Sequence, residues 1–156
     1  MEPNILLCGF GAFGQQHAIA WNIVAPKARL LVADVNPVAR ALALKSGCNE
    51  EDLAESYEDL ISRADIMDIV TPSESHYSLA LAALGKKLPT LIEKPAVKYT
   101  REAEELDALA KSSNTPVQVQ FVLRAHPLVI KAKELLSNGK IGRLVAMDGI
   151  FTGWKR

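Results

Sequence analysis

Three glycines near the start of the chain have the spacing of a phosphate-binding turn. The hexapeptide that begins at Gly9 reads Gly-Phe-Gly-Ala-Phe-Gly and fits the pattern G-x-G-x-x-G. Gly9 would let the backbone turn sharply out of a strand, Gly11 would leave room for a pyrophosphate, and Gly14 would let helix and strand pack closely. The phosphates would bind free backbone amides at the positive end of the next helix, around Ala12 and Phe13. The pattern predicts a nucleotide site; a purely structural glycine turn is the alternative.

A carboxylate follows this turn at the distance that dinucleotide binding requires. Asp34 lies twenty residues after Gly14, at the end of the next predicted strand. A carboxylate there accepts hydrogen bonds from the adenosine ribose and repels the additional 2′-phosphate of NADP, which usually recruits an arginine. Val35 and Asn36 offer no cation, and we expect Arg40 to lie on the surface farther along the helix. The cofactor predicted is therefore NAD, with NADP as the less favoured alternative.

These residues need a framework that places strand ends beside helix beginnings. Short apolar runs, which predict buried strands, alternate with patterns typical of helices. Strands separated by helices in this way predict right-handed crossovers and a parallel sheet covered on both faces. The predicted fold class is α/β, a Rossmann-type doubly wound parallel sheet. We expect strands at residues 5–8, 30–33, 67–70, 90–92 and 117–121, and helices at 14–24, between the cap Asn36 and Gly47, at 74–84 and from 100 onward.

Polar residues indicate boundaries and an edge in this framework. Ser56-x-x-Asp59 is a variant of the capping box, and Thr100 is expected to cap a helix. In the strand at 117–121, Gln118 and Gln120 alternate with apolar residues. Because alternate residues of a strand point to opposite faces, one face of this strand should be near water or at the sheet edge.

The end of the chain predicts a different unit. Pro127 starts a helical pattern that an Asn-Gly pair closes, and residues 144–151 are expected to form a further strand. We therefore divide the chain into a dinucleotide-binding domain at 1–122 and, at 123–156, the linking helix and first strand of an incomplete second α/β domain.

Composition excludes several classes of function. The chain has 156 residues, enough for one ordinary domain, and its 18 basic and 18 acidic side chains cancel. No basic stripe is interleaved with aromatic residues, so we expect no nucleic-acid partner. No apolar run approaches the roughly 18 residues of a membrane helix, so we expect no membrane partner. Two cysteines, Cys8 and Cys48, lack metal-ligand spacing, which predicts no metal site and a reducing cytoplasm.

Three further segments carry a resemblance to a known family. Residues 69–76 read Ile-Val-Thr-Pro-Ser-Glu-Ser-His, residues 93–95 read Glu-Lys-Pro, and residues 124–127 read Arg-Ala-His-Pro, ahead of a later Asn-Gly-Lys-Ile-Gly. Together with the glycine turn, they run in the order found in the glucose–fructose oxidoreductase / inositol dehydrogenase (Gfo/Idh/MocA) family. The chain resembles the N-terminal portion of such an oxidoreductase over almost its whole length, and Glu-Lys-Pro is the most diagnostic segment.

The resemblance implies roles for residues at the strand ends. Thr71 and Pro72 would border the nicotinamide half of the cleft. Lys94 matches the family lysine that faces both nicotinamide and the substrate hydroxyl, where a cation stabilises the alkoxide that develops as hydride leaves carbon. A solvated loop lysine is the alternative. Glu93 would either pair with a neighbouring cation or stabilise the turn.

Two histidines and an arginine also match family positions. His76 would have a structural role near the cofactor, and His17 would pack or bond to backbone. Arg124 approaches the substrate in relatives, but Ala125 replaces the usual aromatic residue and Ser73 the usual asparagine, so the substrate pocket departs from the family pattern. The candidate cofactor-site residues are thus Gly9, Gly11, Ala12, Phe13, Gly14, Asp34, Thr71, Pro72, His76, Glu93 and Lys94, with Lys94 also the candidate catalytic residue.

The resemblance implies an NAD-dependent oxidoreductase that transfers hydride between nicotinamide and a hydroxyl of a sugar, polyol or sugar nucleotide. Family enzymes carry a second domain that floors the substrate site and, in many members, supplies an aspartate and a histidine; all three histidines here precede Pro127. We therefore expect a truncated product of such an enzyme. The alternatives are an NAD-binding sensor, one component of a split enzyme, or a scaffold with an inactive cleft. An unpaired strand at 144–151 also predicts a homodimer through that strand.

Overall fold

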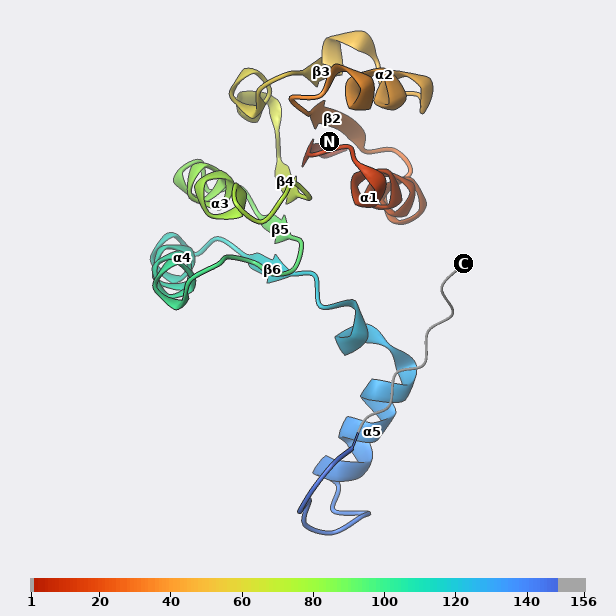
Figure 1. Ribbon diagram of the computed structural model, residues 1–156, viewed down its shortest axis with the longest axis vertical. Coiled ribbons are helices and arrows are strands. Elements are labelled where there is room, and N and C mark those ends of the chain that lie inside the picture. Colours follow the sequence, from red (N-terminus) through yellow and green to blue (C-terminus); the bar gives the residue numbers. More distant parts are fainter. Residues whose placement is uncertain (1, 149–156) are drawn as a thin grey trace. The chain divides into compact units, whose positions relative to one another are not determined.

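A six-stranded sheet forms the centre of the first part of the chain (Figure 1). A computed structural model describes residues 2–148, and contacts divide the chain into two units, residues 1–120 and 121–156. All neighbouring strands pair in parallel, and the order reverses between β1 and β4, which confirms the predicted fold class. The strands are β1 (Asn4–Cys8), β2 (Arg29–Ala33), β3 (Leu53–Ala54), β4 (Ile66–Ile69), β5 (Thr90–Ile92) and β6 (Val117–Val119), in the order β3-β2-β1-β4-β5-β6.

Helices cover both faces of this sheet. In Figure 1, α1 (Ala12–Val24) and α2 (Pro37–Lys45) lie on one face, and α3 (His76–Gly85) and α4 (Thr100–Ser113) lie on the other. Asn36 caps α2 as predicted, because its side chain accepts a hydrogen bond from the Val38 amide at 2.9 Å and Pro37 takes the first helical position. Three short 3-10 turns, η1 (Glu50–Asp52), η2 (Tyr57–Asp59) and η3 (Ile61–Arg63), connect α2, β3 and β4.

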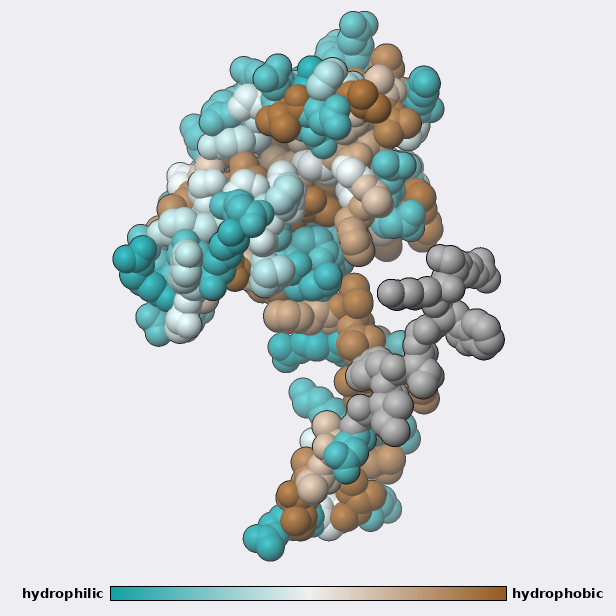
Figure 2. Space-filling model, viewed as in Figure 1, coloured by the Kyte–Doolittle hydropathy of each residue, from teal (hydrophilic) through white to brown (hydrophobic). Residues whose placement is uncertain are grey.

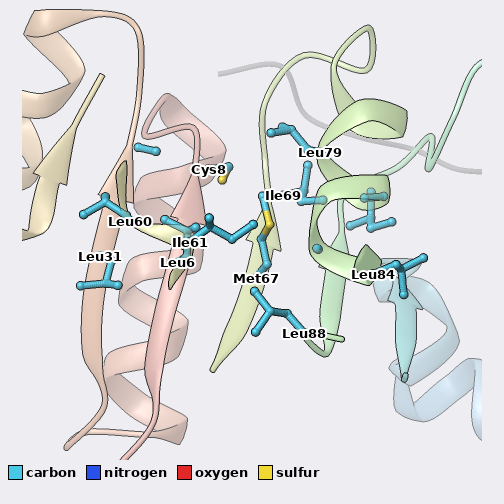
Figure 3. Packing of buried hydrophobic residues seen from close by; sticks show 14 of the residues in the cluster. Leu6, Cys8, Leu31, Leu60, Ile61, Met67, Ile69, Leu79, Leu84 and Leu88 are labelled. Atoms are coloured by element: carbon cyan, nitrogen blue, oxygen red, sulfur yellow. The ribbon is translucent and has the colours of Figure 1, made fainter. Parts of the chain in front are cut away.

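The alternation of side chains along the strands divides the core into two clusters. The larger cluster contains Met67 and Ile69 of β4 and packs against Leu79 and Leu84 of α3, as Figure 3 shows. The smaller cluster, which includes Leu7 and Val32, packs against alanines of α1 and α2. Asp68 lies between Met67 and Ile69 in β4 and therefore points to the face that carries α1. The carboxylate of Asp68 is fully buried in a sheet whose strands are mostly apolar.

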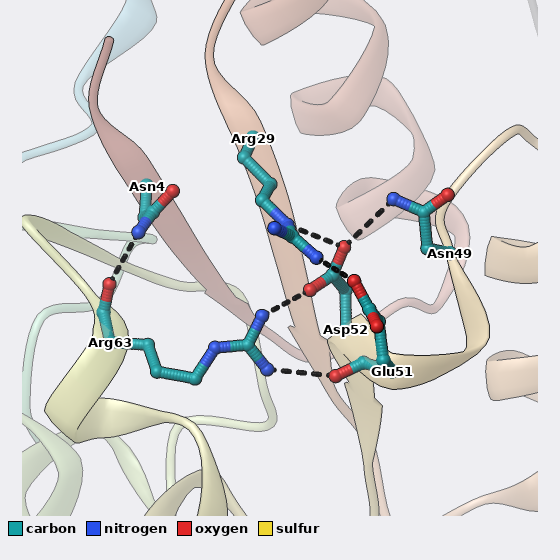
Figure 4. A network of polar contacts seen from close by, with 6 residues as sticks. All are labelled: Asn4, Arg29, Asn49, Glu51, Asp52 and Arg63. Atoms are coloured by element: carbon teal, nitrogen blue, oxygen red, sulfur yellow. Dashed lines mark hydrogen bonds and ion pairs between the residues drawn. The ribbon is translucent and has the colours of Figure 1, made fainter. Parts of the chain in front are cut away.

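A polar network connects the beginning of β2 with the 3-10 turns before and after β3 (Figure 4). The carboxylate of Asp52 is 1% exposed and accepts hydrogen bonds from Arg29 Nε at 2.8 Å, from Asn49 Nδ2 at 3.1 Å and from Arg63 Nη2. Burial alone would raise the pKa of Asp52, but these donors outweigh burial and lower it. The network joins the beginning of β2 to η1 and η3, so it positions the connection that leads into β3.

Several predicted boundaries need correction. β3 was not predicted from the sequence, because two residues are too few to show a periodic pattern. Ser56 makes no side-chain cap bond, so the predicted capping box with Asp59 is wrong. Thr100 is the first residue of α4 and not its cap; the Glu102 side chain instead accepts hydrogen bonds from the backbone that precedes the helix. The predicted edge position of β6 is confirmed, although this strand ends at Val119.

The second unit consists, in its described residues, of η4 (Val122–Ala125), α5 (Pro127–Ser137) and the segment that follows. Pro127 starts α5 as predicted, and Asn138 ends it. The strand predicted at 144–151 is not present at 144–148, which have no regular secondary structure. A strand needs a partner strand for its backbone hydrogen bonds, and the described residues of this unit offer none. The rest of the predicted strand lies outside the described residues.

The surface of the first unit is largely hydrophilic where α4 faces outward (Figure 2). The exposed residues of α4 include Glu104, Asp107 and Lys111, which are charged. Within residues 2–148, no helix has both the length and the apolar character needed to cross a membrane.

Candidate functional site

A cavity of 660 Å³ opens where β1, β2 and β4 end. This is the crevice between β1 and β4 at which the strand order reverses, and ligands of open α/β sheets bind in such crevices. Its position therefore fits the site that the glycine turn predicted. The wall consists of Cys8, Gly9, Gly11, Ala12, Phe13, Ala33, Asp34, Val35, Glu55, Ser56, Tyr57, Glu58, Val70, Thr71, Pro72, Ser75 and Leu79.

The three glycines of the turn differ in how closely other protein atoms approach them. Gly9 has a φ of +94°, and a Cβ there would lie 2.9 Å from the Val70 carbonyl oxygen. A Cβ at Gly14 would lie 2.1 Å from the carbonyl oxygen of Gly9, so α1 can pack this closely only without a side chain. A Cβ at Gly11 would meet no protein atom within 4 Å. The protein's own packing thus requires two of the glycines, while the third faces open space.

The first turn of α1 borders this space. Gly11 is the N-cap residue, so no side chain caps the helix, and no acidic residue lies in the first turn. Backbone amides in the first turn of a helix have no acceptor within the helix, and the helix dipole favours an anion in front of them. The arrangement at Ala12 and Phe13 is therefore suited to phosphate groups.

Asp34 supports the glycine turn from the end of β2. Its Oδ2 accepts a hydrogen bond from the Phe10 amide at 2.7 Å, and its Oδ1 accepts one from the Asn36 amide at 2.8 Å. Each carboxylate oxygen has a further lone pair, and the half-buried side chain lines the cavity. Asp34 is therefore held in place yet still able to accept hydrogen bonds from a ligand.

Arg40 lies closer to Asp34 than the sequence predicted. It is half-buried, and its Nη1 donates to the Asp34 carbonyl oxygen at 2.6 Å. Arg40 lies one turn into α2, and its side chain returns toward the end of β2, because residues three and four apart share a helix face.

The segment 55–58 forms another part of the wall that sequence reasoning missed. It follows β3, and it contributes Glu55, Ser56, Tyr57 and Glu58 to the cavity. The rule that ligands bind beyond the carboxyl ends of parallel strands would have found it, had β3 been recognised. Two acidic residues, Glu55 and Glu58, thus join Asp34 in the wall of the cavity. Cys8 also reaches the wall, and burial raises the pKa of its thiol, which opposes a nucleophilic role.

A second cavity, of 240 Å³, lies between the ends of β4 and β5. Lys94 is exposed here, with its Nζ 5.4 Å from the centre of the Phe13 ring. Within the described chain, no carboxylate lies in ion-pair distance of this ammonium group. The wall consists of Phe13, Val70, Thr71, Pro72, Ser73, His76, Glu93, Lys94 and Pro95, so Phe13, Val70, Thr71 and Pro72 line both cavities.

Glu93 is bound on both of its carboxylate oxygens. Its Oε2 accepts a hydrogen bond from the Lys94 amide at 3.0 Å, and its Oε1 lies 3.3 Å from His17 Nε2. One of the outcomes left open from the sequence is therefore realised, because Glu93 stabilises the turn through the Lys94 amide. Its side-chain partner is His17, which is a cation only when protonated, and not the adjacent Lys94.

His17 also contacts the buried carboxylate of β4. Its Nδ1 lies 2.9 Å from Asp68 Oδ2, which also accepts a hydrogen bond from Trp21 Nε1 at 2.7 Å. His17 packs as predicted, with a side chain that is 10% exposed, but the alternative of a backbone bond is wrong, because its hydrogen-bond partners are carboxylates. The hydrogen bond to Asp68 is the largest cause of a raised His17 pKa; burial opposes it, and Glu93 adds to the rise.

His76 connects the two loops that border the second cavity. It is 1% exposed, with Nδ1 2.9 Å from the Pro95 carbonyl oxygen and Nε2 2.7 Å from the Thr71 carbonyl oxygen. Ser75, just before it, donates to Thr71 Oγ1 at 2.7 Å. His76 therefore ties the Thr71-Pro72 turn to the Glu93–Pro95 turn.

The structure thus gathers all of the predicted site residues around two neighbouring cavities, except that Gly14 acts through packing behind the turn. Arg124 and Ala125 belong to the second unit. No three His, Cys, Asp or Glu side chains in residues 2–148 are grouped so that they could hold a metal ion.

Comparison with known proteins agrees with this geometry. Residues 3–121 match the family model GFO_IDH_MocA, which is described as an oxidoreductase family with an NAD-binding Rossmann fold. Levoglucosan dehydrogenase from Pseudarthrobacter phenanthrenivorans is 28% identical over 95% of this chain and 40% of its own length. Inositol 2-dehydrogenase 2 from Saccharopolyspora erythraea is 31% identical over 96% of this chain and 45% of its own length.

A solved structure shows the same fold. The UDP-N-acetylglucosamine 3-dehydrogenase from Acidithiobacillus ferrooxidans superposes with a TM-score of 0.75 at 26% identity, over 86% of this chain and 42% of the other. The chain therefore spans less than half of the length of the relatives that it matches.

Proposed function

Because the chain belongs to the Gfo/Idh/MocA oxidoreductase family, with its NAD-binding Rossmann fold, we propose that the cavity beside the glycine turn binds NAD. We propose further that the bound cofactor exchanges hydride with a secondary alcohol of a sugar-like substrate. Nicotinamide accepts or returns the hydride, while the residues of this chain bind, orient and stabilise the reactants.

The open space in front of Gly11 carries this proposal. Among the three glycines of the turn, Gly9 and Gly14 are explained by close contacts inside the protein, and Gly11 is not. A pyrophosphate that approaches the backbone supplies the missing reason, since a side chain at Gly11 would occupy its place. The uncapped first turn of α1 adds amide donors and a favourable dipole for the same group.

The acidic residues in the wall of the cavity support NAD over NADP. Asp34, Glu55 and Glu58 all line it, and a 2′-phosphate would be repelled by their carboxylates. Arg40 is the nearby cation, but its Nη1 is bonded to the Asp34 carbonyl oxygen. NADP binding would require this guanidinium to turn toward the phosphate.

Lys94 is the candidate catalytic residue. Its ammonium lies at the second cavity, over Phe13 and beside Thr71 and Pro72, which also line the first cavity. In that position it would stabilise the negative charge that develops on a substrate oxygen as its proton is removed. Glu93 and His76 would hold the turn around Lys94 in position and would not take part in the hydride transfer.

The substrate class comes from the relatives. Levoglucosan, inositol and UDP-N-acetylglucosamine, in the names of three of them, share hydroxyl-bearing rings, so a sugar, polyol or sugar nucleotide is proposed. The relatives are more than twice as long, and we propose that a second domain, of which residues 123–156 are the start, completes the substrate site. An NAD-binding sensor or a component of a split enzyme is the alternative. A homodimer through residues 144–151, the cytoplasmic location and the absence of nucleic-acid partners stay predictions.

Calorimetric titration of this chain with NAD and with NADP tests the cofactor assignment. We expect NAD to bind and NADP to bind more weakly. In Asp34→Ala, loss of a charge-assisted hydrogen bond should weaken NAD binding by roughly 10- to 100-fold and reduce the preference over NADP. Folded protein that binds neither cofactor would contradict the assignment, whereas a preference for NADP would contradict only the role of Asp34.

A further inference from the structure

The ring of His17 faces two hydrogen-bond acceptors at once. Nδ1 lies 2.9 Å from an Asp68 oxygen, and Nε2 lies 3.3 Å from a Glu93 oxygen. An ionised carboxylate only accepts hydrogen bonds, and a neutral imidazole has one N–H to donate. Both contacts are satisfied together only when the ring carries two protons.

Among the described residues that line the groove beside His17, no side chain other than His17 itself carries a charge. On the face of the sheet beside His17, β4 presents Asp68, and the turn after β5 presents Glu93. The described residues of β5 and β6 that line the same groove are uncharged: Thr90, Leu91, Val117 and Gln118, together with Gln120. The charge balance at the ring therefore depends on these two carboxylates.

The contact of His17 with Glu93 should break more easily than its contact with Asp68. Asp68 is fully buried, and its other hydrogen-bond donor is Trp21. Loss of the His17 contact would leave this buried carboxylate with fewer hydrogen bonds, which costs free energy in an apolar interior. Glu93 makes the longer contact and lies at the wall of the second cavity. When the ring loses a proton, the remaining N–H therefore stays with Asp68, and the Nε2 lone pair then faces the Glu93 carboxylate and repels it.

The next residue in the chain offers a partner for a released Glu93 carboxylate. Lys94 has an ammonium group that makes no ion pair with any described residue and lies over the Phe13 ring. A free carboxylate at the wall of the same cavity would be attracted to it. An ion pair between them would occupy the group that is proposed to face the substrate.

We propose that His17 is a positioning residue for Lys94: while doubly protonated it holds the Glu93 carboxylate away from the Lys94 ammonium, and on losing a proton it releases that carboxylate to pair with Lys94. The catalytic meaning of this arrangement rests on the proposed function, but the arrangement itself is independent of cofactor and substrate. His17 contacts neither reacting group, so it acts only through Glu93.

The test follows the titration of Lys94 by NMR in the folded chain, with 13C-labelled lysine and no cofactor. In the wild-type protein we expect the Lys94 signal to move in two steps as pH rises. The smaller step should share its midpoint with the ring signals of His17, and the larger is the deprotonation of Lys94 itself. Glu93→Gln should remove the smaller step, because glutamine carries no charge to bring to the ammonium.

Variants then separate positioning from a merely structural role. His17→Leu removes the group that holds Glu93, so the smaller step should disappear, and at the acidic end of the titration the Lys94 signal should already lie where the wild-type signal lies after that step. In the wild-type protein His17 loses its proton before Lys94 does, so the Lys94 midpoint should be the same in His17→Leu and should fall by roughly 0.2–0.7 pH units in Glu93→Gln, the shift that an exposed ion pair produces. In the double variant His17→Leu/Glu93→Gln, the midpoint should equal that of Glu93→Gln alone.

Two results would overturn the proposal. One is a Lys94 signal in folded His17→Leu that lies, at the acidic end of the titration, where the wild-type signal lies before the smaller step; the other is a smaller step that persists when Glu93 is already glutamine. If His17→Leu does not fold, the wild-type protein decides the question, because a single-step titration of Lys94 excludes the release of Glu93. Failure of the chain to bind NAD would remove the proposed function and leave these titrations unaffected.

Discussion

At the scale of single residues, the glycine turn combines packing and binding requirements that can be separated experimentally. Gly14→Ala would place a Cβ 2.1 Å from the carbonyl oxygen of Gly9, and backbone cannot move away as a flexible side chain would. We expect the variant to lose about 1–3 kcal/mol of unfolding free energy, as overpacked sites do. Urea unfolding followed by circular dichroism measures this loss.

Gly11→Ala is the matched variant at the second glycine. The backbone of Gly11 is extended, with φ −68° and ψ −164°, and no protein atom lies within 4 Å of the added Cβ. The unfolding free energy should therefore change by no more than about 1 kcal/mol, as expected for an N-cap substitution, while NAD binding should weaken because the Cβ takes the place of the pyrophosphate. Unchanged NAD affinity in folded Gly11→Ala would exclude the proposed pyrophosphate position.

At the scale of secondary-structure elements, the Asp52 network determines how the chain enters β3 (Figure 4). Because the pKa of Asp52 is lowered in the folded protein, its stabilising effect is present above the pKa of the unfolded carboxyl group, near 4. The effect is lost as pH falls through the lower pKa of the folded state. The unfolding free energy should therefore decrease as the solution is acidified below about pH 4.

Asp52→Asn tests this dependence. The substitution keeps the shape of the side chain but removes its charge, and we expect a loss of about 1–3 kcal/mol at neutral pH, as for hydrogen bonds to charged groups. The variant should also show a flatter pH dependence in acid. Asp107→Asn is the control: Asp107 forms an exposed pair with Lys111, so its loss should change stability by less than about 1 kcal/mol. Equal effects of the two substitutions would contradict the role of the network.

The elements also show how far sequence patterns reach. The alternation of Gln118 and Gln120 predicted an edge strand, and β6 lies at the sheet edge. β3 escaped detection because a two-residue strand exists only through pairing with β2. The segment 55–58 that follows it therefore could not be assigned to the cavity from the sequence.

At the scale of the whole molecule, the chain consists of two units, and both hydrophobic clusters belong to the first. Their buried members and the residues packed against them lie between Leu6 and Val117. A shortened chain of residues 1–120 therefore loses no core residue, and it retains every residue that lines the two cavities. We expect it to fold with a melting temperature within about 4 °C of the full chain, the change that about 1 kcal/mol produces, and to bind NAD with similar affinity.

Calorimetry of both chains, by scanning and by NAD titration, checks this prediction. A fall of 10 °C or more in melting temperature, roughly 2 kcal/mol for a domain of this size, would show that the second unit stabilises the first. A loss of NAD affinity at unchanged stability would instead show that residues 121–156 contribute to the cofactor site.

Local patterns sufficed for the glycine turn, for Asp34 at the end of its strand and for the α/β class, because each depends on residues close together along the chain. The partners of His17 had no such pattern: Asp68 lies 51 residues away and Glu93 lies 76 residues away. Their meeting depends on the side of β4 to which Asp68 points and on α1 covering that side. Contacts of this kind are decided when strands acquire neighbours and faces become inner or outer, and that happens only when the sheet assembles.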